Sequence, residues 1–559
     1  MTPSAVGRRG KVLLIELTPT VPNLGRYIVM PRFGLLAIAS ILAEKTGYEV
    51  KLLFEPYLGT IDADRIVRED PKYILVNGLT TSAFDNEAFL SSLRERLGSR
   101  VPVIAGGEHA SMFPDDARRY ADFVLLYEGD ETVVSLLSAL EEDDAGERDQ
   151  KLGSIPGLLF RDSAGVWRRN AGIRRVEKID YRYDFRVVAG AENAVSRFRL
   201  SQIPLQTSRG CKHYCSFCSW ISLYGKVGYY LRPVADVLHD VSHAIEYTGI
   251  RSFMVTDNLF GGNVAYAEEL LGRIAERFER EEKKPVFTVL CRADQFFGER
   301  GVFSDKLLAL MRRAGVTHVS LGLESLSPKS LVQMRKKSDV PQFLAAADRL
   351  NRNGFHIAAT FVAGFDGDEY EDVVEIGRFS RRIGCFTIQV YARNIAPGTL
   401  DDMLADFRII PGCMDKYRNG HTVNIFPSRM LPSTLQKAIF EAGTLFYDDK
   451  DPQKRLVGRV YRQVWNGIRP HYEALRRLED EILLPERIYV CEGGNGYRLK
   501  DKSLRAVMED PVRLGAMEKR IRSIFHAVSR KTFLDDPAGR VLSERPPPTL
   551  SEGIAKRSS

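Results

Sequence analysis

Residues 207–218 read Thr-Ser-Arg-Gly-Cys-Lys-His-Tyr-Cys-Ser-Phe-Cys and place three cysteines, Cys211, Cys215 and Cys218, on one short stretch. The whole chain of 559 residues has only 7 cysteines, so a triplet this tight is not expected by chance. A 4Fe–4S cluster takes four ligands, and three thiolates therefore leave one iron open to a substrate or a cofactor. The stretch predicts a catalytic iron–sulfur site with these three cysteines as its metal ligands.

Two other kinds of cysteine site compete with this interpretation. A structural zinc site usually uses two Cys-x2-Cys pairs or a mixture of cysteine and histidine. This chain has one Cys-x2-Cys pair, and His213 lies inside the triplet, where joint ligation is geometrically awkward. A disulfide framework is typical of small secreted chains that are dense in cysteine. Zinc therefore remains the main alternative to the cluster.

The composition is that of an ordinary globular protein, with 44% apolar and 27% charged residues. The length predicts about two to four domains. No apolar run approaches the roughly 20 residues of a membrane helix. The short apolar run 12–15 is interrupted by Glu16, so no signal peptide is predicted. We therefore expect a cytoplasmic protein without a membrane span, in a compartment where thiols stay reduced.

The formal net charge of +7 is small for a chain of this length, and no basic block is interleaved with aromatic residues. Nucleic-acid binding is therefore not predicted. A mildly basic surface is either an ordinary mixture of solvated charges or a surface that steers an acidic electron donor, such as a flavodoxin or ferredoxin.

The N-terminal part of the chain, residues 11–140, alternates short apolar strands with helical patterns. Helices are predicted at 33–44 and 85–97 from apolar residues spaced three and four apart. This alternation predicts an α/β fold with a parallel, doubly wound, Rossmann-like sheet. Its strands are expected at residues 12–17, 48–54, 73–78, 101–105 and 123–127.

Small and polar residues follow the strands of this predicted sheet. Ligands of such sheets bind beyond the carboxyl ends of the strands, and glycine lets the backbone approach them closely. No Gly-x-Gly-x-x-Gly follows the first strand, which argues against a dinucleotide. The candidate binding residues are Thr80, Thr81 and Ser82, then Gly106, Gly107, Glu108 and His109, and finally Glu128 and Gly129, which Asp130 and Glu131 follow.

A second alternation of strands and helices runs from residue 203 to about 395. It predicts a partial (β/α)6 barrel of the TIM type, whose active site collects at the carboxyl ends of the strands. The cysteine triplet lies in the loop after the first of these strands, as that rule requires. The strands are expected at 203–207, 252–256, 286–290, 318–322, 356–362 and 386–391, and the polar residues Asp257, Arg292, Glu324 and Ser325 follow three of them.

The predicted domains follow from these patterns and from changes in composition. Residues 141–152 are charged and are expected to be an exposed linker. C-terminal helices are predicted at 432–447 and 459–481, the second broken or kinked near Pro470. The expected ranges are 1–145 for the Rossmann-like domain, 146–200 for a linker with a β-hairpin, 201–400 for the barrel, 401–540 for a mostly helical domain and 541–559 for a flexible tail.

The cysteine triplet, with Phe217 just before its last cysteine, resembles the signature of radical S-adenosylmethionine (radical SAM) enzymes. The resemblance implies that S-adenosylmethionine chelates the open iron of a 4Fe–4S cluster. Such a zwitterionic sulfonium needs both carboxylate and cationic partners. By this likeness the residues near the cofactor are Phe217, Asp257, Arg292, Glu324 and Ser325, although Asp257 and Ser325 also fit helix capping.

Joined to the N-terminal sheet, the triplet resembles the cobalamin-dependent class of these enzymes over roughly residues 10–400. The points of likeness are residues 31–35, 106–110 and 128–131. The resemblance implies that cobalamin binds at the polar strand ends of the N-terminal domain. The Asp-x-His-x-x-Gly pattern of other cobalamin proteins is absent. Three alternatives therefore stay open: cobalamin with no histidine below it, His109 as its ligand, or a domain that has lost the cofactor.

The class resemblance implies a methyltransferase that methylates a carbon of a small-molecule or natural-product substrate. The alternative is a radical SAM enzyme that does not methylate, such as a cyclase or a ring-contracting enzyme. A methylthiotransferase would need a second cluster, and the first 210 residues contain no cysteine to hold it. A non-catalytic corrinoid carrier would leave the cysteine triplet unexplained.

Overall fold

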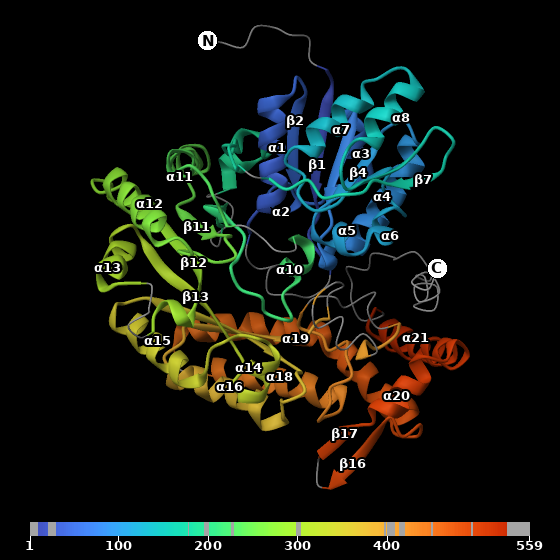
Figure 1. Ribbon diagram of the computed structural model, residues 1–559, viewed down its shortest axis with the longest axis vertical. Coiled ribbons are helices and arrows are strands. Elements are labelled where there is room, and N and C mark those ends of the chain that lie inside the picture. Colours follow the sequence, from blue (N-terminus) through green and yellow to red (C-terminus); the bar gives the residue numbers. More distant parts are fainter. Residues whose placement is uncertain are drawn as a thin grey trace.

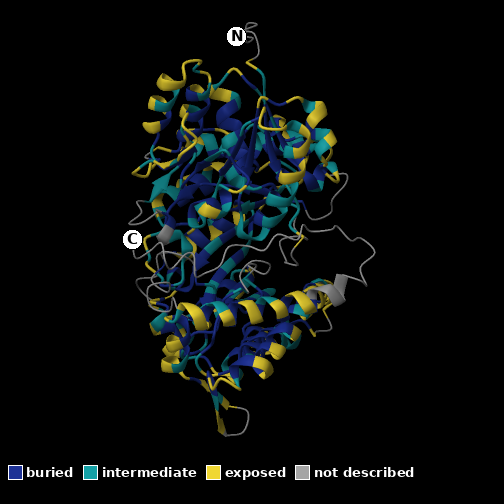
Figure 2. Ribbon diagram, turned by 90° about the vertical axis from the view of Figure 1, so that its right-hand side faces the viewer, coloured by how far each residue is buried: buried dark blue, intermediate teal, exposed yellow. Residues whose placement is uncertain are grey.

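The computed structural model describes residues 9–20, 29–176, 178–194, 201–224, 229–297, 303–395, 399, 408–412, 420–448, 451–493 and 496–533. The chain forms an N-terminal sheet domain, a curled parallel half-barrel and a group of C-terminal helices (Figure 1). Buried residues fill the interior of these parts, and exposed residues lie mainly on the outer helices (Figure 2). The expected tail at 541–559 lies outside the described residues.

The N-terminal sheet has seven strands in the order β2-β1-β3-β4-β5-β6-β7. Its first five strands are parallel, and their order 2-1-3-4-5 confirms the predicted doubly wound fold. Leu14 and Ile15 of β1 belong to separate buried clusters, because both faces of the sheet are covered. The parallel strands are β1 (Lys11–Glu16), β2 (Glu49–Phe54), β3 (Tyr73–Asn77), β4 (Val103–Gly106) and β5 (Phe123–Leu125).

Two segments of this domain have structure that the sequence did not predict. The expected hairpin, β6 (Leu158–Arg161) and β7 (Trp167–Arg169), pairs antiparallel onto β5 and so extends the sheet. The segment 141–152, predicted as an exposed linker, is mostly exposed, but helix α8 (Ala145–Gly153) occupies most of it. The Asp144 carboxylate caps this helix, and Leu152 is buried in the core.

The central domain is a half-barrel of six parallel strands in the order β15-β14-β13-β12-β11-β8. This order confirms the predicted partial barrel. The strands are β8 (Ile203–Leu205), β11 (Ser252–Val255), β12 (Val286–Arg292), β13 (Val316–Glu324), β14 (His356–Ala363) and β15 (Thr387–Ala392). Helices α11 (Val234–Thr248), α12 (Val264–Arg277), α13 (Asp305–Arg313), α15 (Val340–Arg352) and α16 (Tyr370–Arg382) lie on the outer side of the sheet (Figure 1).

The C-terminal helices cover the edge of the barrel at β15. Helix α18 (Pro432–Tyr447) packs beside α16 and β15, and the Tyr447 hydroxyl donates to the Ile388 carbonyl at 2.7 Å. Helix α19 (Pro452–Leu478) continues through Pro470 without the predicted break and packs against α21 (Pro511–Phe533). A hairpin, β16 (Tyr489–Gly493) and β17 (Gly496–Leu499), was not expected. Within the described residues, no helix is both long and apolar enough to cross a membrane.

Close packing between α16 and α18 predicts that alanine substitution of two helical glycines will change the thermal stability of the protein to different extents. A Cβ added to Gly377 of α16 would lie 2.1 Å from the Ala442 carbonyl oxygen of α18. A Cβ added to Gly272 of α12 would meet nothing within 4 Å. We expect Gly377→Ala to lower the thermal midpoint by about 2–6 °C, since overpacking forces the helices apart. Gly272→Ala should leave it unchanged or raise it, because alanine favours helix. Equal effects of both variants in a thermal melt would contradict this packing.

Candidate functional site

The cysteine loop, residues 211–218, lies beyond the carboxyl end of β8, at the mouth of the half-barrel. It follows the short strand β9 (Ser208–Arg209), which pairs with β10 (Tyr230–Leu231). Gly210 has a φ of 108°, which favours glycine and turns the chain into the loop. Cys211, Cys215 and Cys218 form no disulfide and are partly exposed. All three predicted ligands therefore lie on one loop, although among the described residues no three Cys, His, Asp or Glu side chains are gathered around a single metal-ion position.

The buried carboxylate of Asp257 supports the start of this loop. It accepts hydrogen bonds from the backbone N–H of Thr207 at 2.7 Å and from the hydroxyl of Ser208 at 2.6 Å, as well as from the Thr207 hydroxyl. Burial raises the pKa of Asp257, and these hydrogen bonds oppose the shift. Asp257 was expected near the cofactor. The structure places it beneath the loop, where its contacts fix the strand that carries the cysteines.

A segment after helix α14 (Pro328–Gln333) packs against the middle of the cysteine loop. The backbone N–H of Ser216 donates to the Met334 carbonyl, and its hydroxyl donates to the Gln333 carbonyl, both at 3.0 Å. Phe217 packs edge-on against Phe365, with ring centroids 6.1 Å apart. The loop is therefore held on its inner side by the barrel.

Two cations lie near the thiols, and each is paired with a carboxylate: Arg292 with Asp294 at 3.0 Å, and Lys336 with Glu324 at 2.8 Å. The Arg292 guanidinium lies 3.8 Å from the Cys215 sulfur and donates to the Lys336 carbonyl at 2.7 Å. Burial raises the pKa of the Cys211 thiol, while the charges of Arg292 and Lys336 act in the opposite direction. Burial and then Arg292 lower the pKa of His213 to about 4. Arg292 and Lys336 thus oppose the effect of burial on the Cys211 thiol without overcoming it, and the three cysteines of the loop are a ligand set that fits an iron–sulfur cluster.

Glu324 and Lys336 form a buried ion pair at the end of β13. The Lys336 Nζ lies 2.8 Å from a Glu324 carboxylate oxygen, and both side chains are nearly inaccessible to solvent. Glu324 has a φ of 69°, which is unusual for a residue with a side chain. A Cβ on Gly322 would lie 2.4 Å from that same carboxylate oxygen, so the pair needs glycine there. Sequence reasoning found Glu324 and missed Lys336, whose only signal is a short basic run.

Ser325 belongs to a second polar cluster, which joins the ends of β13 and β14. Its hydroxyl accepts from the Ser327 N–H at 3.0 Å and lies 3.5 Å from Asp368. The Asp368 carboxylate also accepts from the N–H groups of Gly364 at 2.8 Å and Phe365 at 3.0 Å. Paired opposite charges and oriented hydroxyls at one barrel mouth fit a zwitterionic ligand with a ribose diol. Asp368 was not predicted, although it closely follows the polar end of a predicted strand.

The small polar residues of the N-terminal domain lie at the carboxyl ends of β3 and β4, as expected. Thr80, Thr81 and Ser82 form the 3-10 turn η2 (Thr80–Ser82), with both threonines partly exposed. Gly106 ends β4, and a Cβ on Gly107 would lie 1.9 Å from the Asn77 side chain, which explains that glycine. A Cβ on Gly129 would touch Ile38 at 3.3 Å. These two glycines therefore allow close packing within the domain, and the partly exposed threonines are the polar side chains that this edge offers to a ligand.

His109 does not face this edge. It is 1% exposed, its ring packs 5.1 Å from that of Phe113, and its Nε2 lies 3.6 Å from an Asp116 carboxylate oxygen. The first 200 residues contain no other histidine. A corrinoid at this edge would therefore be held without a histidine from this domain below its cobalt, which is one of the alternatives left open by the sequence.

Glu128 and Glu108 contact the cysteine loop region of the other domain. The Arg209 guanidinium donates to the Glu128 carboxylate at 2.6 Å, and the Ser219 hydroxyl donates to the Glu108 carboxylate at 2.8 Å. Both glutamates were expected to contact a cofactor. The structure instead brings them to the two flanks of the cysteine loop, so the loop lies between the two ligand-binding edges.

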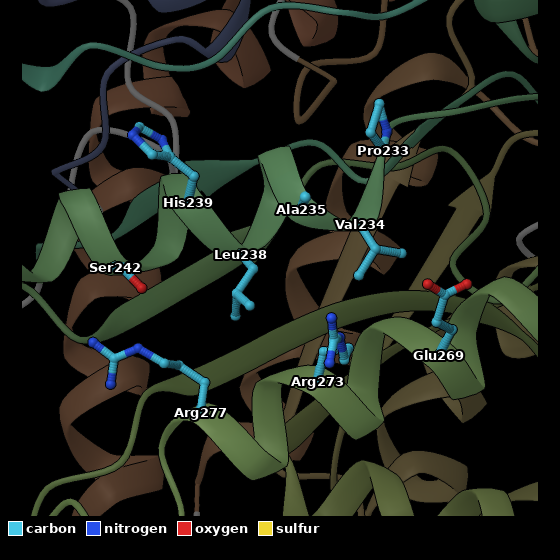
Figure 3. A pocket seen from close by; sticks show the side chains of 9 residues that line it. All are labelled: Pro233, Val234, Ala235, Leu238, His239, Ser242, Glu269, Arg273 and Arg277. Carbon is cyan, nitrogen blue, oxygen red and sulfur yellow. The ribbon is translucent and has the colours of Figure 1, made fainter.

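A separate cavity of about 500 Å³ lies on the outside of the barrel, between α11 and α12 (Figure 3). It contains none of the predicted site residues. Its lining residues are Pro233, Val234, Ala235, Leu238, His239, Ser242, Glu269, Arg273 and Arg277.

Two protein families match this chain in succession. Residues 24–137 match the B12 binding domain, and residues 205–380 match the radical SAM superfamily. The two matched ranges correspond to the N-terminal sheet domain and to the half-barrel with its cysteine loop. The matches confirm the resemblance that the sequence motifs indicated.

Individual relatives are distant. An uncharacterized methyltransferase of Pyrococcus horikoshii is 25% identical over 401 residues, covering 70% of this chain and 82% of the relative. An anaerobic magnesium-protoporphyrin IX monomethyl ester cyclase of Synechocystis is 26% identical over 381 residues, covering 65% and 71%. Among solved structures, the radical S-adenosylmethionine methyltransferase TsrM of Kitasatospora setae shares the fold, with a TM-score of 0.55, 16% identity and coverage of 93% and 99%.

The arrangement of the thiols predicts that iron retention depends on each cysteine of the triplet. We expect Cys215→Ala to lose most of the iron that the wild type retains after anaerobic reconstitution, about four atoms per chain. Cys491→Ser is the matched control, because Cys491 is an exposed thiol on β16, away from the loop. Iron and sulfide analysis measures both variants. Full iron retention by Cys215→Ala, or zinc in the wild type, would contradict the cluster assignment.

Proposed function

We propose that this chain, which joins a B12-binding domain to a radical SAM domain, is a methyltransferase that acts on a carbon of a small molecule. The observation that carries the proposal is the position of the cysteine loop. Its flanks contact the carboxyl-end loops of the N-terminal sheet, while its centre packs on the barrel mouth. The two ligand-binding edges therefore open onto a shared region, where a substrate carbon can meet both cofactors.

In the proposed reaction, the residues of this chain bind and orient the cofactors and shield the reacting centre from water. Cys211, Cys215 and Cys218 would hold a 4Fe–4S cluster, Arg292 would offset its negative charge, and the Glu324–Lys336 pair would orient S-adenosylmethionine. When bound, these groups and a corrinoid supply radical chemistry and a methyl carrier. The protein's own contribution is placement and the exclusion of water from the reacting centre.

The surface beside the cysteine loop supports an acidic electron donor, such as a flavodoxin or ferredoxin, as the partner. The loop and the neighbouring segment 332–337 expose three cations and two apolar side chains. These residues are Lys212, Arg335 and Lys337, with Tyr214 at 50% and Val332 at 79% exposure. Exposed cations attract an acidic protein, and exposed apolar side chains can be buried when it binds.

A second candidate function is a radical reaction that changes a carbon skeleton without methylation. The observation in its favour is the likeness to anaerobic magnesium-protoporphyrin IX monomethyl ester cyclases, at 26% identity for the Synechocystis protein. The likeness to named methyltransferases is as close in identity and covers slightly more of the chain. Both reactions would use the same two domains, so the product distinguishes them.

The proposed role of the buried ion pair predicts an effect on S-adenosylmethionine affinity. Lys336→Met removes the cation beside Glu324, and we expect the Kd for S-adenosylmethionine to rise at least about tenfold, the loss of one charge-assisted contact. Lys329→Met, an exposed lysine on α14, is the control and should bind normally. Calorimetry on reconstituted protein measures both. Wild-type affinity in a Lys336→Met protein with full iron content would refute this role.

Methyl transfer predicts both a corrinoid complex and a specific mass change. We expect anaerobically reconstituted protein to retain a visible corrinoid spectrum after desalting. With S-adenosylmethionine labelled at its methyl group and a small-molecule extract of the source organism, one product should gain a single labelled CH2 unit. The Cys215→Ala protein is the control, since it should form no product. Products that lack the label would instead support the carbon-skeleton reaction, and protein that retains no corrinoid would overturn the proposal.

A further inference from the structure

Arg209 crosses from the half-barrel into the N-terminal domain, two residues before Cys211. Its guanidinium donates to the Glu128 carboxylate at 2.6 Å and to both carboxylate oxygens of Asp130, at 3.0 and 3.1 Å. The side chains are only 8%, 6% and 12% exposed, respectively. Glu128 is fixed in turn, because it accepts from the Val176 N–H at 2.8 Å. A buried, bidentate arginine–carboxylate contact of this kind has a defined geometry, and loss of one partner leaves an uncompensated buried charge.

A second contact lies at the opposite end of the cysteine loop. Ser219 directly follows Cys218 and begins helix α10 (Ser219–Tyr224), and its hydroxyl donates to the Glu108 carboxylate at 2.8 Å. Glu108 begins helix α5 (Glu108–Met112), and α10 packs against α5 (Figure 1). Both flanks of the loop are therefore tied to the N-terminal domain, at the ends of two different strands of its sheet.

We propose that these two contacts form a latch that sets the position of the cysteine loop relative to the corrinoid-binding edge. Arg209, Glu128 and Asp130 make one point of the latch, and Ser219 with Glu108 makes the other. They are positioning residues, and the glutamates act on the loop rather than on a bound cofactor. The inference rests on the proposed function, in which a substrate carbon must be reached from both domains. A displacement of about 1 Å can cost such a reaction on the order of 10²-fold in rate.

The latch is tested first without any cofactor. The variant Glu128→Gln with Asp130→Asn and Ser219→Ala removes the charge from the Arg209 contact and the donor from the Ser219 contact, and it nearly preserves side-chain volume. In cluster-free protein, we expect faster backbone amide exchange in peptides covering 207–224 and 127–131, with unchanged exchange in α16 and α18. Glu281→Gln, which breaks the Arg251–Glu281 ion pair at 2.7 Å within the barrel domain, is the control and should change neither latch peptide. Unchanged exchange in the latch variant would overturn the proposal.

The second test uses the reconstituted holoenzyme and compares two products. The latch variant should keep its iron, its corrinoid spectrum and its formation of 5′-deoxyadenosine within about twofold, because the cluster site itself is intact. The ratio of methylated product to 5′-deoxyadenosine should fall more than about tenfold. An unchanged ratio, or loss of corrinoid with full iron content, would overturn the positioning role. A wild type that never methylates would refute the proposed function, while the exchange result would still decide the latch.

Discussion

A single buried carboxylate holds the start of the cysteine loop in its place. Asp257 accepts hydrogen bonds from Thr207 and Ser208, which ties the end of β11 to the end of β8. A buried carboxylate without partners would cost on the order of a few kcal/mol, so these hydrogen bonds favour keeping the two paired strand ends together. Arg209 then faces the neighbouring domain, and Gly210 turns the chain toward the barrel mouth. The position of the three thiols follows from this arrangement.

The buried cations around the cysteine loop lie next to partners of opposite charge. Thiolates and a cluster bring negative charge into a partly buried region, and Arg292, which also pairs with Asp294, is the cation that lies against the Cys215 sulfur. Arg209 carries a further buried cation on the loop's other flank, where carboxylates of the N-terminal domain neutralise it. The same residues therefore serve the electrostatics of the site and the contact between domains. Either of the two candidate reactions would use this geometry.

Local patterns in the sequence predicted the helices and strands and singled out the three cysteines. They did not predict contacts between residues that are far apart in the sequence. Buried parallel strands are short apolar runs, so their positions were predictable to within a few residues, and the triplet is contiguous in the chain. Asp257, Arg292, Glu324 and Ser325 were found because each follows a strand. The contact between Glu128 and Arg209 joins residues 81 positions apart, and no pattern marks it. Lys336 pairs with Glu324, whose backbone has a positive φ, and the sequence reveals neither feature.

Electron paramagnetic resonance of the reduced wild-type protein tests the central claim most directly. Three thiolates on one loop should hold a cluster with one iron whose fourth position is open. The account predicts that the spectrum of the reduced cluster changes when S-adenosylmethionine is added, because that ligand binds the open iron. An identical spectrum with and without S-adenosylmethionine, or reconstituted protein that gives no cluster signal and contains zinc, would contradict it.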